Sequence, residues 1–239
     1  MDPLSLKKLN ALRRERRAAI LLTELTDGRD RVIREGDPVA GSLGEAVARA
    51  FRSGRSGAVE IDGNSFFLNV HLPPPRLVVI GAVHISQALA PMARIAGFDL
   101  TIIDPRTAFA SPDRFPGVDL HAEWPDEVLK SAPLDAYTAL AALTHDPKID
   151  DPAILAALKA ECFYIGALGS RKTHAKRVER LMAAGAKSEA VARIEAPIGL
   201  DIGASTPAEI AVAVLGSVIA ALRSRGLMAK DGTGKEQAA

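Results

Sequence analysis

Hydrophobic and polar positions along residues 76–106 follow the order of a β-strand, a helix and a second β-strand. An apolar, largely β-branched run, Leu77–Ile80, is followed at once by Gly81. A stretch with helical spacing then leads to Gly97, and a second apolar run, Phe98–Ile103, ends in Asp104. Strand, Gly turn, helix, strand and acidic residue form the order of a βαβ nucleotide-binding unit.

Strands and helices continue to alternate from residue 124 to residue 224. Helices are predicted over residues 124–130, 151–160, 171–182, 188–193 and 207–224, and strands over 136–143 and 162–165. Asp151-Pro152 is expected to open its helix with Pro at the first position, and Ser170 and Thr206 are expected to cap theirs. Alternating strands and helices favour a Rossmann-like α/β fold, with a parallel sheet covered by helices on both faces.

Residues 1–72, which precede the Rossmann-like segment, have a different pattern of predicted helices and hairpins. A helix is predicted over residues 3–19, a strand over 18–26 that pairs with 31–34, and a hairpin from 58–61 and 66–70. Ser42 and Glu45 form a capping box for a helix from about residue 43. Pro73-Pro74-Pro75 continues neither sheet nor helix. We therefore expect a small α+β module (1–72), a Rossmann-like domain (73–227) and a disordered tail (228–239).

Composition narrows the functional classes. The net charge of +1 indicates no general attraction to nucleic acid or to an anionic membrane, and the aromatic content of 4% is low for a base-stacking surface. No apolar run reaches the roughly 18 residues needed to span a bilayer, and the charged N-terminus does not resemble a secretory signal. Cys162 is the single cysteine, which fits a reducing compartment. We expect a cytoplasmic protein.

Ligands of parallel α/β sheets bind beyond the carboxyl ends of the strands, which selects four clusters. In the first, Gly81 is the only residue of a G-x-G-x-x-G fingerprint, because Val83 and Ser86 occupy the other Gly positions. His84 begins the predicted helix and is either a ligand contact or a capping residue. In the second, Asp104 follows Gly81 by 23 residues, the spacing of a ribose-binding acid, and Arg106 is placed for a phosphate. Asp104 could equally end the strand and start a turn.

The third cluster contains His145 and Asp146, which could contact a ligand or form a general base. Spacing typical of a metal site is absent from the sequence. The fourth cluster is the strongest candidate for anion binding: Gly166 and Gly169 permit unusual backbone angles, Ser170 caps a helix, and Arg171 and Lys172 add positive charge. Its alternative is a capped helix with a solvated basic face. Cys162 has apolar neighbours that indicate a buried, inert thiol.

These stretches resemble the XdhC/CoxI family of accessory proteins for xanthine dehydrogenase and related molybdenum hydroxylases. The resemblance covers roughly the C-terminal two-thirds of the chain. The segments that carry it are PPPRLVVIGAVH (73–84), GFDLTIIDPR with AFASPDRFP (97–116), LTHDPKID (143–150), YIGALGSRKTHAKRVERL (164–181) and RIEAPIGLDIGASTPAEIAVAVLGSVIA (193–220). The family usually has GAGH where this chain has Gly81-Ala82-Val83-His84, and it usually has a longer N-terminal domain, so the module here is abbreviated.

The resemblance implies a carrier of molybdenum cofactor that binds the pyranopterin, with or without an attached nucleotide, protects it during sulfuration and delivers it to the apo-hydroxylase. Implied partners are the large subunit of the apo-hydroxylase and a cysteine desulfurase. We also expect a homodimer, and we hypothesise that a separate small protein supplies the missing N-terminal part. The alternative function is an NAD(P)-dependent oxidoreductase, which Val83 disfavours because its side chain obstructs a pyrophosphate. A third possibility is a structural partner that docks on a hydroxylase without binding cofactor.

Overall fold

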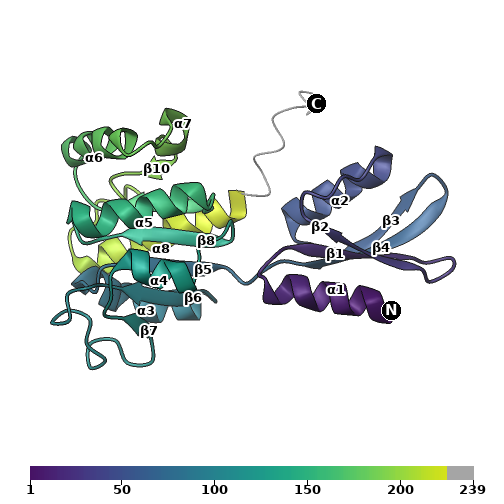
Figure 1. Cartoon of the computed structure of the whole chain (residues 1–239), viewed down its shortest axis with the longest axis horizontal. Coiled ribbons are helices and arrows are strands. Elements are labelled where there is room, and N and C mark those ends of the chain that lie inside the picture. The colour runs from purple at the N-terminus through teal and green to yellow at the C-terminus, as the bar shows by residue number, and fades with distance from the viewer. Residues whose placement is uncertain (225–239) are drawn as a thin grey trace. The chain divides into compact units, whose positions relative to one another are not determined.

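The computed structural model describes residues 1–224, in which the chain forms two compact units, Met1–Pro73 and Pro74–Leu222 (Figure 1). The tail predicted to be disordered, 228–239, lies outside the described residues. The change from one unit to the other falls within the run of three prolines, where neither a helix nor a sheet can continue.

The first unit is a four-stranded antiparallel sheet in the order β2-β1-β4-β3 with two helices. Leu9 and Leu12 of the first helix are buried with Leu21 and Val32 of the sheet. The elements are α1 (Pro3–Arg14), β1 (Ala19–Glu24), β2 (Asp30–Arg34), α2 (Gly41–Ser53), β3 (Gly57–Ile61) and β4 (Asn64–His71). Both predicted hairpins are present, with β1 paired to β2 and β3 paired to β4.

Two local predictions in this unit are wrong. The first helix ends at Arg14 because Arg16 takes a left-handed conformation (φ +53°) and turns the chain into β1. The capping box is also not formed: α2 is capped by Ala40, which makes no side-chain capping hydrogen bond, so Ser42 lies inside the first turn. Gly44 has no side chain, so the carbonyl of Val39 packs against this turn and the helix begins earlier than predicted.

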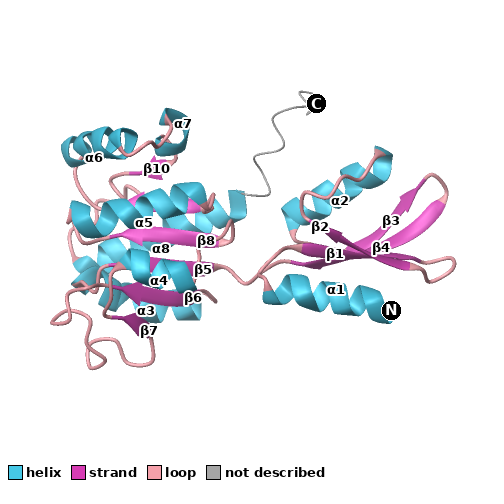
Figure 2. Cartoon of the chain, in the orientation of Figure 1, coloured by secondary structure: helices cyan, strands magenta, loops and turns pink. Residues whose placement is uncertain are grey.

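The second unit contains a six-stranded parallel sheet in the order β10-β9-β8-β5-β6-β7 (Figure 2). Its strands are β5 (Arg76–Ile80), β6 (Asp99–Ile103), β7 (Asp119–His121), β8 (Thr138–Ala142), β9 (Tyr164–Ala167) and β10 (Ile194–Glu195). The Rossmann-like fold predicted from the sequence is confirmed. The short edge strands β7 and β10 were not predicted, because two or three residues carry no readable periodicity.

Helices cover both faces of this sheet (Figure 2). Alternate residues of β5 point to opposite faces: Leu77 and Val79 pack with α3 and α8, whereas Val78 and Ile80 pack with α4, α5, α6 and α7. The helices are α3 (His84–Ile95), α4 (Pro125–Ser131), α5 (Pro147–Lys159), α6 (Arg171–Ala183), α7 (Ser188–Val191) and α8 (Pro207–Ser224). As predicted, Thr206 caps α8, since its Oγ1 accepts a hydrogen bond from the N–H of Glu209 (3.2 Å).

Helix α8 is long and apolar enough to cross a membrane by length and composition alone. Its residues Ala211, Val214 and Val218 are instead fully buried in the core beside α3 and β5. In the described residues this helix is therefore a layer of the α/β fold.

The strand order creates a switch point between β5 and β8. The chain moves from β5 to β6 and β7, then returns to the other side of β5 to form β8, β9 and β10. Crevices at such points, beyond the carboxyl ends of the strands, are the usual ligand sites of these sheets. The four clusters selected from the sequence all lie at this edge.

Candidate functional site

The turn between β5 and α3 is closed by contacts within the protein. Gly81 has φ +117°, and a Cβ added there would lie 2.9 Å from Cγ2 of Thr144, so the turns after β5 and β8 touch. Asp104 is fully buried beside them. Its Oδ2 accepts hydrogen bonds from the N–H of Ala82 (2.8 Å) and Nη2 of Arg106 (2.7 Å), and its Oδ1 from the N–H (3.0 Å) and Nε (2.9 Å) of Arg106.

These hydrogen bonds keep Asp104 ionised and occupy the acceptor positions that a ligand would need. Burial favours the neutral carboxyl, but the hydrogen bonds from Arg106 and from the Ala82 N–H outweigh burial, and the pKa of Asp104 lies below its ordinary value. A carboxylate accepts about four hydrogen bonds, and all four are already made inside the protein. In this structure Asp104 therefore anchors the turn and has no acceptor left for a ribose.

Arg106 and Arg114 brace the same turn from the loop before β7. The guanidinium of Arg106 lies 4.5 Å from the ring centroid of Phe109. Nη1 of Arg114 donates to the carbonyl of Ala82 (2.9 Å), and Nη2 donates to Oε1 of Gln87 (3.0 Å). Sequence analysis missed Arg114, because it lies in a loop segment that has neither periodicity nor a motif.

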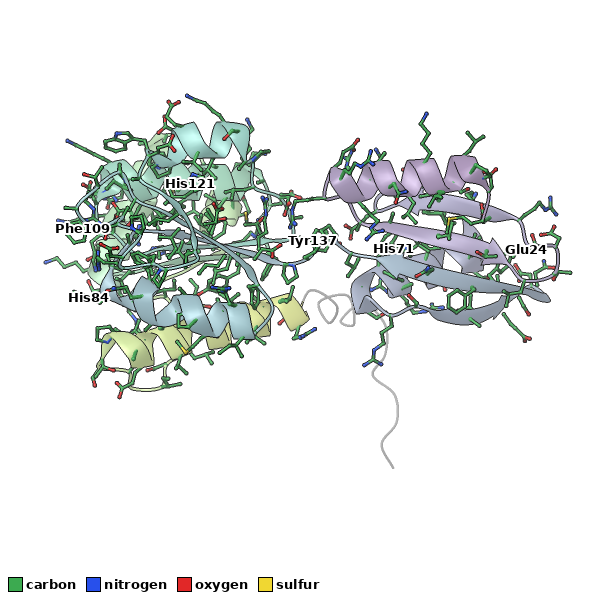
Figure 3. The ribbon with its side chains drawn as sticks, turned by 90° about the horizontal axis from the view of Figure 1, so that it is seen from below. Glu24, His71, His84, Phe109, His121 and Tyr137 are labelled. Carbon is green, nitrogen blue, oxygen red and sulfur yellow. The ribbon has the colours of Figure 1, made fainter. Side chains whose placement is uncertain are left out.

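Val83 and His84 follow this turn. Val83 is the N-cap of α3, has an extended backbone (φ −95°) and packs against the hydrophobic core of that face. His84 is exposed at the first position of α3, at the same end of the unit as Phe109 (Figure 3). Val83 therefore occupies the position of the second fingerprint Gly, where the fingerprint requires a residue without a side chain.

The turn after β8 is held by a buried acid that the sequence analysis missed. Asp150 is 1% exposed, and its Oδ1 accepts from Oγ1 of Thr144 (2.7 Å), while its Oδ2 accepts from the N–H of His145 (3.1 Å). Burial raises the pKa of Asp150 to about 6, although these hydrogen bonds and the charge of Arg177 oppose the rise. The bond to the His145 N–H stabilises the left-handed backbone of that residue (φ +64°).

Asp146 has a local role in this turn. It is the N-cap of α5, and its Oδ1 accepts from the N–H of Lys148 (2.9 Å). The helix therefore begins at Pro147, one turn earlier than predicted, and Pro152 lies inside it. Both Asp146-Pro147 and Asp151-Pro152 fit the start of a helix, and the sequence pattern alone favoured the wrong pair.

The turn after β9 approaches the turn after β8. Gly169 has φ +129°, and a Cβ added there would lie 3.8 Å from Nδ1 of His145. Ser170 caps α6 as predicted, since its Oγ accepts from the N–H of Thr173 (3.2 Å). Gly166 has a packing role, because an added Cβ would lie 2.5 Å from Cγ1 of Ile198.

Between α5 and α6, these turns border a cavity of about 370 Å³. It contains four basic side chains and two acidic ones, and one of the acids, Asp151, is paired with Arg180 (2.6 Å). The cavity is therefore electropositive. It is lined by His145, Pro147, Asp150, Asp151, Lys172, Thr173, Lys176, Arg177 and Arg180.

The cavity brings together part of the predicted site. His145 lines it with Lys172, whereas Arg171, at the first position of α6, is exposed and lies outside the lining set. Lys176 and Arg177 were missed, although their spacing of four residues from Lys172 and Thr173 places them on one helical face. The cavity lies beside the ends of β8 and β9. The switch point lies between the neighbouring pair β8 and β5, where Gly81 packs against Thr144.

Metal binding has little support in the described part of the chain. Within residues 1–224, no group of three or more His, Cys, Asp or Glu side chains could hold a metal ion. Cys162 is fully buried, and burial raises the pKa of its thiol to about 12. The thiol is therefore protonated and shielded, which makes it a poor nucleophile.

Comparison with known proteins places these features in a family. The sequence model of the XdhC Rossmann domain matches residues 77–218, which include every residue that lines the cavity. A protein of Bacillus subtilis described as a probable xanthine dehydrogenase subunit is 32% identical over 148 residues, covering 62% of this chain and 43% of the relative. The molybdenum cofactor insertion chaperone PaoD of Escherichia coli is 33% identical over 146 residues, covering 61% of this chain and 40% of the relative.

A crystal structure described as a xanthine dehydrogenase from Bacillus halodurans superimposes with a TM-score of 0.61 at 22% identity, covering 96% of this chain and 66% of that chain. This similarity supports the fold. The chain spans between 34% and 43% of the length of the curated relatives it matches.

Proposed function

Because the chain belongs to the XdhC family, we propose that it binds molybdenum cofactor, protects it while its sulfido ligand is installed, and delivers it to an apo molybdenum hydroxylase. The observation that carries the proposal is the electropositive cavity between α5 and α6, which lies wholly within the matched domain. A relative of this chain is named as an insertion chaperone for the same cofactor.

The size and charge of the cavity fit one part of molybdenum cofactor. A volume of about 370 Å³ is at the lower end of ordinary small-molecule pockets, so it would take the phosphate end of the cofactor and leave the pterin outside. The N-terminus of α6 lies at its border, and helix N-termini favour anions. His145 and the turn containing Gly169 form the adjoining wall.

The rival function, an NAD(P)-dependent oxidoreductase, has less support. A dinucleotide in the usual Rossmann position needs a Gly turn open to the pyrophosphate and an acid free for the ribose. Here Val83 packs against the core beside that turn, and Asp104 makes four hydrogen bonds within the protein. Fluorescence titration with NADH tests this rival directly, and saturable binding with a shifted emission would favour it.

The test of the proposed function is reconstitution of an apo-hydroxylase. Purified protein, molybdenum cofactor, a cysteine desulfurase with cysteine, and the large subunit of the apo-enzyme are combined, and hydroxylase activity is measured with and without this protein. The proposal predicts faster and more complete activation in its presence. Equal activation without it would contradict delivery, and binding to the hydroxylase with no cofactor bound would instead favour a purely structural partner.

A further inference from the structure

The geometry points to a phosphate-binding subsite in the cavity between α5 and α6, in which Arg177 supplies a buried guanidinium and Lys172 and Lys176 supply the rim. The inference rests on the proposed function only for the identity of the natural ligand, which would present a phosphate monoester or diphosphate. The subsite itself is a property of these side chains and can be tested with inorganic anions.

Arg177 is the main reason for this inference. Its side chain is almost fully buried, at 2% exposure, and it lines the cavity. Nη2 donates to the carbonyl of Leu168 (2.9 Å), but Nε and Nη1 have no hydrogen-bond partner among the described residues. A buried charged group with unmet donors is destabilising, because the water that would satisfy those donors in the unfolded chain is lost. A bound anion would remove this cost.

The neighbouring acids, Asp150 and Asp151, interact with Arg177 through their charges, but the hydrogen bonds they accept come from other groups. Asp151 forms an ion pair with Arg180, and Asp150 accepts its hydrogen bonds from Thr144 and from the N–H of His145. Burial lowers the pKa of Arg177, but an Arg side chain remains charged at neutral pH. The guanidinium therefore carries a positive charge and two hydrogen-bond donors, Nε and Nη1, that have no partner among the described residues.

The first two turns of α6 complete the arrangement. Lys172, Thr173 and Lys176 line the cavity and are exposed, so the ammonium groups of the two Lys can move onto a ligand, whereas the hydroxyl of Thr173 already shares a hydrogen bond with Oγ of Ser170 (3.1 Å). Lys172 and Lys176 lie one helical turn apart, as do Thr173 and Arg177, so all four residues share one face of α6. A guanidinium, two ammonium groups and a hydroxyl are the donors that a tetrahedral phosphate recruits, because it offers several acceptor oxygens and more than one negative charge.

Asp150 makes the subsite sensitive to pH. It faces the cavity with Arg177, Arg180, Lys172, Lys176, His145 and Asp151 as the other charged or titratable groups that line it. An anion beside a buried carboxylate is repelled, so binding should be accompanied by proton uptake. Affinity for an anion of constant charge should therefore rise as the pH falls from 7.5 to 5.5.

The test is calorimetric titration of the full-length chain with inorganic pyrophosphate, with inorganic phosphate in a second arm. One site per chain is expected. Lys176→Gln should weaken binding by about three- to tenfold, as loss of an exposed cationic contact does, and Arg177→Met by about tenfold or more. Lys187→Gln, which removes the same charge outside the cavity, is the matched control and should bind like wild type.

Two further measurements keep the test decisive. If Arg177→Met does not fold, the double variant Lys172→Gln/Lys176→Gln takes its place, because both residues are exposed. The ring resonances of His145 should shift on addition of pyrophosphate, and sulfate, whose charge is constant, should bind more tightly at pH 5.5 than at 7.5. The subsite would be overturned if neither pyrophosphate nor phosphate bound, or if Lys176→Gln and Lys187→Gln bound pyrophosphate with equal affinity. Anion binding without any retention of molybdenum cofactor would uphold the subsite and refute the proposed function.

Discussion

Replacement of Asp150 by Asn tests the electrostatics of the candidate site through folding stability. Asp150 is a buried carboxyl that holds the turn after β8 through Thr144 and the N–H of His145. Asn keeps the size of the side chain and removes its titration. Comparison of the two proteins at several pH values therefore isolates the free energy that depends on the ionisation of Asp150.

The magnitude follows from the raised pKa. The pKa of Asp150 is about 6 in the folded protein against 3.8 ordinarily, and this difference corresponds to about 3 kcal/mol. The folded state binds the proton of Asp150 more tightly than the unfolded state does. The stabilisation from this proton is therefore fully present below pH 3.8 and is lost as the pH rises through 6. Between pH 4.5 and 7.5 the loss amounts to about 2 kcal/mol.

Urea unfolding followed by tryptophan fluorescence measures this quantity. Trp124 is the single tryptophan and belongs to the second unit, so the signal reports the unit that contains Asp150. The stability of wild type minus that of Asp150→Asn should fall by about 2 kcal/mol from pH 4.5 to 7.5. Asp201→Asn, which removes an exposed carboxyl in the same unit, is the matched control. A difference that stays constant or grows with pH would refute the reasoning.

Three further predictions concern the turn after β5 and the thiol. Gly81→Ala should destabilise the second unit by about 2–4 kcal/mol in urea unfolding, because of its positive φ and a Cβ placed 2.9 Å from Thr144; an unchanged midpoint would contradict the close approach. Asp104→Ala should cost about 3 kcal/mol, since it leaves Arg106 and a buried N–H unpaired, and wild-type thermal stability would argue against the anchoring role. Cys162 should resist alkylation by iodoacetamide at pH 7.5 until urea unfolds the unit, because burial raises the pKa of its thiol to about 12; rapid labelling of the folded protein would show that the thiol is accessible.

Periodicity and capping residues predicted much of the fold. The βαβ unit of residues 76–106, the Ser170 cap and the Thr206 cap are all present, because each depends on interactions within a few residues. The wrong starts were also local. Ser42 and Pro152 both had a suitable pattern, but the packing of Val39 on Gly44 and the capping by Asp146 placed those helices differently.

The candidate site was less predictable, because its decisive features depend on three-dimensional partners. The spacing of Asp104 from Gly81 fits a ribose-binding acid, yet the sequence could not show that Arg106 and a backbone N–H would use its acceptors. A buried Arg with unpaired donors, such as Arg177, likewise looks like any residue of a basic helix until α5 is packed against it. Charge on a helical face can be read from a sequence, but burial of that charge cannot.

Cofactor retention by the purified protein tests the central claim most directly. Wild type and the Lys172→Gln/Lys176→Gln variant would be purified from a molybdenum-replete host and analysed for molybdenum by mass spectrometry and for pterin by oxidation and fluorescence. The account predicts molybdenum and pterin in equal amounts, approaching one of each per chain in wild type and clearly reduced in the variant. Wild-type protein that carries neither molybdenum nor pterin, and does not take up added cofactor, would contradict it.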